Sequence, residues 1–186
     1  TILCSSPALP VTNLVFDEQW AVAYSGFRKG QHPDRGFGAK NPTYEQTLED
    51  LEILIDYDFK LIRLYDSGVN SEMVLQVIDD HKLPIKVVLG AWLDAEISNH
   101  DRCGWLNKPI PQEKLKENKK KNKAEVKNAI RLANKFRDSV VAISVGNETQ
   151  IFWHDHTVPE ESLLNYIRQV KRKTTQLVTV ADDYGW

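Results

Sequence analysis

One apolar segment of this chain ends directly in an amide and a carboxylate. Residues 140–145 read Val-Val-Ala-Ile-Ser-Val, and Gly146, Asn147 and Glu148 follow them. An uninterrupted run of apolar or small residues is typical of a parallel strand that is covered on both faces. In α/β barrels, catalytic residues gather at the carboxyl ends of such strands. The segment therefore predicts an α/β fold in which Glu148 is an active-site carboxylate.

Strands and helices alternate along the rest of the chain. Short apolar runs predict four further strands, at residues 20–24, 61–65, 85–89 and 177–181. Helical spacing between the strands predicts helices that begin after Thr43, at Ser71, after a polar insertion that ends near Glu117, and at Pro159. This order implies right-handed crossovers and a parallel sheet. Since no GxGxxG fingerprint follows the first strand, we favour a barrel over an open doubly wound sheet.

The length of the chain limits how much of a barrel it can form. A complete (β/α)8 TIM barrel typically needs about 250 residues, and this chain has 186. We therefore expect one incomplete barrel domain over residues 1–186, with about the first five β/α units and an N-terminal extension over residues 1–18. The open edges of such a sheet predict self-association.

Charge and hydropathy argue against two kinds of partner. The formal net charge is -2, which gives no electrostatic reason to bind nucleic acid. No apolar run approaches the roughly 20 residues that span a bilayer, so we expect no membrane insertion. The lysines of residues 114–127 are interpreted as a solvated helix surface.

Arg63 occupies an unusual place in the second predicted strand. Period-two alternation puts Leu61, Arg63 and Tyr65 on one face of this strand. A guanidinium there needs a carboxylate or a polar network, and we expect Glu148 or a neighbouring acid to be its partner. An arginine that only ties strand ends together remains an alternative.

The predicted strand ends carry an ordered set of short motifs: Arg63-Leu64-Tyr65, Val88-Leu89-Gly90 with Trp92, and Val145-Gly146-Asn147-Glu148. Together they resemble glycoside hydrolase family 17, which contains 1,3-β-glucanases and related glucosyltransferases. Its bacterial branch is most similar in three further segments: Tyr24-Ser25-Gly26-Phe27-Arg28, Gln31-His32-Pro33 and Ala181-Asp182-Asp183-Tyr184. The resemblance covers residues 20–186.

The resemblance implies a (β/α)8 barrel and a retaining hydrolase of β-1,3-glucan. In this family the Glu that follows Asn on the fourth strand is the general acid/base, a role that falls to Glu148. Asn147 would then hydrogen-bond the sugar 2-hydroxyl. A retaining mechanism also needs a nucleophilic carboxylate about 5–5.5 Å from the acid. The family carries it on the seventh strand, so we expect it C-terminal to this chain.

Other side chains at the predicted strand ends are expected to bind sugar. Aromatic rings pack against the apolar faces of glucose, and polar groups hold its hydroxyls. The expected substrate-binding residues are Asn147, Arg63, Tyr65, Tyr24, Trp92, Asp94, Asp183 and Tyr184. Trp105 and Trp153 lie in predicted loops and carry less weight.

The sequence His154-Asp155-His156 contains residue types that bind metals. No complementary acid or cysteine spacing occurs elsewhere, and the retaining mechanism needs no metal, so we expect neither a metal nor a cofactor. We expect the two histidines to border the acceptor side of the cleft. Two alternatives stay open: a β-1,3-glucan transglycosylase or glucosyltransferase, and a non-catalytic fragment that binds glucan. The substrate class suggests an extracellular, periplasmic or membrane-associated location.

Overall fold

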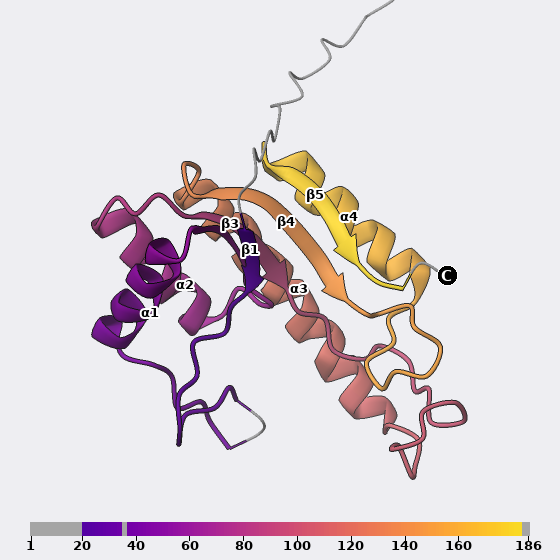
Figure 1. The fold of residues 1–186 in the computed structure, drawn as a ribbon. Helices are drawn as coiled ribbons and strands as arrows, with labels where there is room; N and C mark the ends of the chain where they lie inside the picture. Colours follow the sequence, from indigo (N-terminus) through magenta and orange to yellow (C-terminus); the bar gives the residue numbers. More distant parts are fainter. Residues whose placement is uncertain (1–19, 35–36, 184–186) are drawn as a thin grey trace, which may run out of the picture.

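The computed structural model describes residues 20–34 and 37–183. Strands and helices alternate throughout this part of the chain, as predicted (Figure 1). In order they are β1 (Trp20–Ala23), α1 (Tyr44–Asp56), β2 (Phe59–Arg63), α2 (Val69–Asp80), β3 (Lys86–Ala91), α3 (Gln112–Lys135), β4 (Val140–Asn147), α4 (Glu160–Lys173) and β5 (Leu177–Ala181). The predicted N-terminal extension lies outside the described residues.

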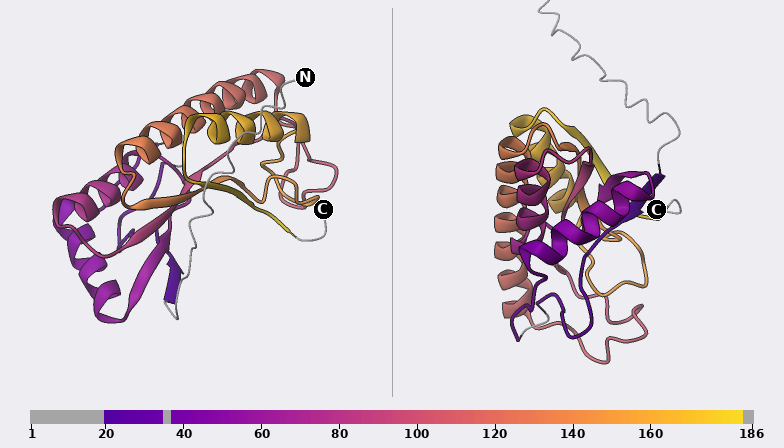
Figure 2. Two further views of the ribbon diagram at one scale, coloured as in Figure 1. Left: turned by 90° about the horizontal axis from the view of Figure 1, so that it is seen from above. Right: turned by 60° about the vertical axis from the view of Figure 1, so that its left-hand side comes forward.

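The described strands form one parallel sheet whose order follows the chain, β1-β2-β3-β4-β5. The described helices lie on one face of this sheet, and none of them covers the other face (Figure 2). A doubly wound sheet has a point at which the strand order reverses, and the described strands show no such reversal. The parallel α/β sheet is confirmed, and its closure into a barrel stays a prediction.

The alternation predicted for β2 divides its side chains between the two faces of the sheet. Ile62 and Leu64 are buried on the side of the helices. Leu61 and Arg63 are half-buried and Tyr65 is exposed, as expected for the opposite face. The helix-free face therefore carries the polar and aromatic side chains at the end of β2.

The core lies between the sheet and the helices. Its largest members are inaccessible to solvent and come from strands and helices alike: Ile62, Leu64, Leu75, Ile78, Leu89, Leu132 and Ile143. Burial of one such side chain contributes about 1.5–3 kcal/mol to the free energy of unfolding. This packing fixes the strand ends relative to one another.

The helix starts were predicted with mixed success. Thr43 caps α1 in a capping box, because its hydroxyl accepts from the Gln46 N–H and the Gln46 side chain accepts from the Thr43 N–H. The cap predicted at Ser71 is wrong, since α2 has Gly68 as its N-cap residue. Asp66 supplies the missing acceptor there, for the Gly68 N–H at 2.9 Å and for the Ser71 hydroxyl at 2.7 Å.

The helix α3 begins earlier than predicted, at Gln112 rather than after Glu117. Its lysines over residues 114–127 are exposed, which confirms them as a solvated surface. Asn118 and Asn122 are buried on the opposite side of the helix. None of the described helices combines the length and apolarity that crossing a lipid bilayer requires.

Candidate active site

Glu148 lies immediately after the carboxyl end of β4. Its backbone is left-handed, with φ of 54°, and its N–H donates to the Ala181 carbonyl on β5 at 2.7 Å. A left-handed conformation is unfavourable for a residue other than glycine by roughly 1–2 kcal/mol, and such strain is concentrated at functional sites. The turn brings the Glu148 side chain to the rim of the sheet, where it is 47% exposed.

A pocket of about 480 Å³ surrounds this side chain. Four of the predicted site residues line it: Arg63, Asn147, Glu148 and Asp183. They come from the ends of β2, β4 and β5, which are far apart in the sequence. Trp153 also lines this pocket, although it was expected to matter less because it lies in a loop.

The partner of Arg63 is an amide and not the expected acid. Its Nη2 atom donates to Asn147 Oδ1 at 2.6 Å, and its guanidinium carbon lies 5.0 Å from the centre of the Tyr65 ring. Since a guanidinium can only donate, the Asn147 oxygen faces Arg63 and its amide N–H₂ is left for another acceptor. The expectation of Glu148 as partner is therefore wrong.

Asp182 lines the pocket but was not among the predicted site residues. Its carboxylate accepts from the Gln150 N–H at 3.1 Å and from the Thr149 hydroxyl at 3.4 Å. These contacts attach the start of the β4–α4 loop to the end of β5. Tyr184, the other predicted residue of this segment, lies outside the described residues.

Three of the remaining predicted sugar contacts line two further pockets along the same rim. Tyr65 and Trp92 line one of about 580 Å³, and Trp92 and Asp94 line one of about 300 Å³. Trp92 is thus shared by both pockets, and its Nε1–H donates to Asp94 Oδ1 at 3.3 Å. These residues lie beside Glu148's pocket and not within it.

Tyr24 lines none of these three pockets. Its hydroxyl donates to Asp50 on α1 at 3.1 Å, and Asp50 also forms an ion pair with Arg28. Burial raises the pKa of Tyr24, and the neighbouring Asp50 carboxylate raises it further. Tyr24 therefore packs against α1.

Glu125 on α3 forms hydrogen bonds to two backbone segments of the rim. Its carboxylate accepts from the Ser67 N–H at 2.6 Å and from the Trp92 N–H at 3.2 Å. It thereby holds the segments that follow β2 and β3. Burial raises the pKa of Glu125, against the effect of its hydrogen bonds to Ser67 and Trp92. No sequence pattern indicated this role, because Glu125 stands in a lysine-rich helix.

Two histidines of the β4–α4 loop contact the Asn147-Glu148 pair. His154 Nε2 lies 2.8 Å from Glu148 Oε2, and His156 Nε2 lies 2.9 Å from the Asn147 carbonyl oxygen. Asp155 separates them in the sequence, and its Oδ1 atom faces both rings. The only sequence signal was the closeness of these residues to Glu148.

No model of a known protein family matches the chain, and no curated protein matches it significantly. The resemblance to glycoside hydrolase family 17 thus rests on the strand-end motifs alone and stays a prediction.

Proposed function

We propose that the protein is a retaining glycoside hydrolase of β-1,3-glucan, with Glu148 as its general acid/base. One observation carries the proposal. Glu148 directly follows Asn147 at the carboxyl end of β4, and both line one pocket with Arg63 from β2. The family 17 pattern has the same two residues at the end of its fourth strand.

The proposal includes closure of the sheet into a (β/α)8 barrel. Three features support it: the strands are parallel, their order follows the chain, and the described helices lie on one face. In a barrel every β/α unit has these three features. The carboxyl ends of the strands then form one catalytic rim.

In the proposed reaction, Glu148 donates its proton to the glycosidic oxygen as the bond to the leaving sugar breaks. It then removes a proton from the water that attacks the covalent intermediate. Asn147 donates its free N–H₂ to the sugar 2-hydroxyl, a bond that strengthens in the transition state. Asp183 holds hydroxyls in the same pocket, and Trp153 offers an aromatic face.

The nucleophile is assigned to the strand that corresponds to the seventh of the family. Asp182 and Asp183 line the pocket of Glu148, but neither is proposed for this role. Asp182 already accepts hydrogen bonds from Thr149 and Gln150, which suits an anchor for the loop. Asp183 is proposed to bind the sugar, as the family resemblance implies.

The direct test compares the full protein with its Glu148→Gln variant on laminarin-type β-1,3-glucan. The glutamine keeps the size of the side chain but cannot supply a proton, so we expect kcat to fall by about 10²–10⁴-fold. Glu160→Gln is the matched control, because Glu160 is exposed at the start of α4. Equal rates for Glu148→Gln and the wild type would contradict the assignment.

A second test separates the acid/base role from a general loss of function. An aryl glucoside with a dinitrophenolate leaving group needs no proton from the enzyme, so Glu148→Ala should still form the covalent intermediate. Azide attacks that intermediate without a base and should restore turnover, with β-glucosyl azide as the product of net retention. Glucan binding without turnover in the wild type would favour a non-catalytic glucan-binding protein.

A further inference from the structure

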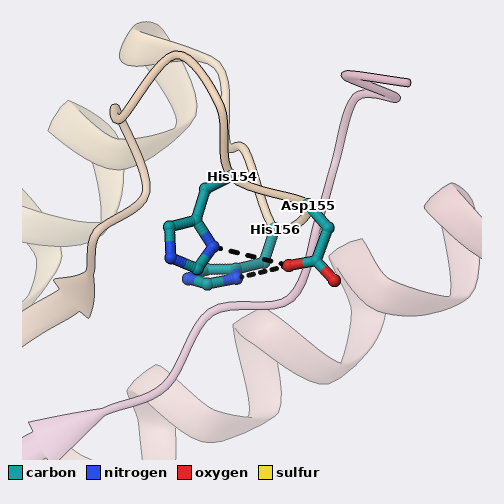
Figure 3. A group of neighbouring side chains, drawn as sticks. All are labelled: His154, Asp155 and His156. Carbon is teal, nitrogen blue, oxygen red and sulfur yellow. Dashed lines mark hydrogen bonds and ion pairs between the residues drawn. The ribbon is translucent and has the colours of Figure 1, made fainter. Parts of the chain in front are cut away.

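Three consecutive side chains of the β4–α4 loop converge on one point (Figure 3). The Nδ1 atoms of His154 and His156 lie 3.4 and 3.0 Å from Asp155 Oδ1. One ligand atom from each residue lies within 4.8 Å of the other two. In a tetrahedral zinc site with bonds of about 2.0–2.1 Å, ligand atoms lie about 3.3 Å apart. The two distances from Asp155 Oδ1 are therefore close to those between ligands in a metal site.

The outer nitrogen of each imidazole faces an acceptor. His154 Nε2 faces the Glu148 carboxylate, and His156 Nε2 faces the Asn147 carbonyl oxygen. The Asn147 carbonyl can only accept, so His156 Nε2 carries the hydrogen, and His154 Nε2 carries it when Glu148 is ionised, the form that Glu148 has after it has donated its proton. In a neutral imidazole the lone pair is then on Nδ1, the atom that faces Asp155.

This choice of tautomers brings together three acceptors. Two imidazole lone pairs and one carboxylate face one another, and none of these three groups donates a hydrogen bond to the others. His154 Nδ1 is buried and has no hydrogen-bond partner among the described residues. A divalent cation satisfies all three acceptors at once. Histidines that bind zinc commonly donate their other N–H to a carboxylate or a backbone carbonyl, as both rings do here.

Neighbouring segments hold these rings in place. Asn99 donates from Nδ2 to the carbonyl oxygens of Phe152 and His154, at 2.7 and 2.9 Å. Trp105 packs edge-on against His154 with 5.8 Å between ring centres, and Trp92 lies 5.0 Å from His156. The loop is therefore ordered by contacts outside the cluster, which lowers the entropic cost of binding an ion.

We propose that His154, Asp155 and His156 bind a zinc-type divalent cation through His154 Nδ1, the Asp155 carboxylate and His156 Nδ1. Two imidazoles and a carboxylate favour zinc and its neighbours over Mg²⁺ and Ca²⁺, which prefer oxygen ligands. Asp155 is 40% exposed and lines a pocket of about 300 Å³ with His156, so a water molecule has access to a fourth position.

The ion fixes the β4–α4 loop beside Glu148 and takes no part in glycosidic cleavage. The spacing in the sequence argued against a metal because no further ligand motif recurs. The structure adds evidence that the sequence spacing could not provide. The hydrogen bonds of both Nε2 atoms direct the two Nδ1 atoms toward one carboxylate.

The test is a calorimetric titration of the full protein with ZnCl₂ after removal of bound metal by a chelator. We expect one Zn²⁺ per chain and no binding of Mg²⁺. His154→Asn and His156→Asn should each weaken Zn²⁺ binding by at least about tenfold, as loss of a direct ligand exceeds loss of an outer contact. His81→Asn is the control, because His81 lies at the far end of α2. Unchanged affinity in both loop variants would overturn the site.

An NMR measurement of the imidazole nitrogens identifies the bound atoms without relying on variants that could unfold. Addition of Zn²⁺ should shift the Nδ1 resonances of His154 and His156 while Nε2 keeps its hydrogen. Nδ1 hydrogens that Zn²⁺ does not displace would overturn the proposal, since the cluster would then be bridged by protons. Neither experiment needs a sugar substrate. Zinc binding without glucan hydrolysis would reject only the glucanase proposal, and hydrolysis without zinc binding would reject only the metal site.

Discussion

Arg63 on β2 and Asn147 on β4 are joined by a hydrogen bond of 2.6 Å that spans the intervening strand β3. The bond fixes the Asn147 amide, because its oxygen must face the arginine and its N–H₂ group must face elsewhere. Asn147 thereby becomes a donor of known direction next to Glu148. A donor at this place suits the proposed contact with a sugar hydroxyl.

Exchange of Asn147 for aspartate tests this orientation. The Asn147→Asp variant keeps an oxygen for Arg63 but replaces the N–H₂ donor with a second acceptor. We expect kcat/KM on β-1,3-glucan oligosaccharides to fall by about 10²-fold or more, as for loss of one donor to a transition state. Urea unfolding should show that stability is retained. Asn165→Asp, on the exposed side of α4, is the control. Wild-type kinetics for Asn147→Asp would contradict the donor role.

Gly90 on β3 allows the segment that follows β2 to approach β3 closely near this bond. A Cβ atom added at Gly90 would overlap the carbonyl group of Tyr65. Because the obstacle is backbone and cannot rotate away, Gly90→Ala should reduce the free energy of unfolding by about 3 kcal/mol. Gly104→Ala meets no atom within 4 Å and should change it by less than about 0.5 kcal/mol. Chemical denaturation of both variants checks the difference, and similar values for the two would reject this explanation.

The sequence predicted those features that depend on periodicity. The bounds expected for β5, residues 177–181, are those of the structure. Glu148 was placed correctly at the end of β4, because a run of buried residues that stops at a polar pair marks a strand end. The period-two alternation likewise placed Ile62 and Arg63 correctly on opposite faces of β2.

Contacts between side chains of different loops could not be predicted in this way. Asn147 was not recognised as the partner of Arg63, since nothing in the spacing of 84 residues distinguishes an amide from a nearby acid. The contact of His154 with Glu148 depends on a loop that Asn99 holds from another segment. Gly68 replaced Ser71 as the α2 cap because the acceptor, Asp66, precedes the helix. Such choices follow from tertiary packing and not from local propensity.

Glu96 joins the polar insertion that follows β3 to α3 and α4. Its side chain is 1% exposed, accepts from the Tyr166 hydroxyl at 2.6 Å and from Asn122 at 3.0 Å, and pairs with Lys119 at 3.3 Å. Burial raises the pKa of Glu96, but these interactions outweigh it, so the pKa lies below its ordinary value of 4.5. The ionised group therefore stabilises the fold at neutral pH.

Replacement of Glu96 by glutamine should lower the free energy of unfolding by about 2 kcal/mol at pH 7, because the buried charge-assisted contacts are lost. Since the folded state lowers this pKa, the stabilisation is complete above pH 4.5 and is lost as the pH falls through the folded value. The gap between wild type and Glu96→Gln should thus close in acid. Glu117→Gln, whose ion pairs are exposed, should show little effect at either pH. A gap that persists well below pH 4.5 would contradict the assigned pKa direction.

Glu125 should show the opposite dependence on pH. Burial raises its pKa above the ordinary 4.5, so the folded state binds a proton more readily than the unfolded state does. The free energy of unfolding of the wild type, relative to Glu125→Gln, should therefore rise as the pH falls from above the folded pKa toward 4.5. The glutamine oxygen can still accept from the Ser67 and Trp92 N–H groups, so the variant should fold. Urea unfolding of both proteins at pH 7.5 and near pH 5 measures the change. A difference that is independent of pH would show that the Glu125 carboxyl has the same pKa in both states.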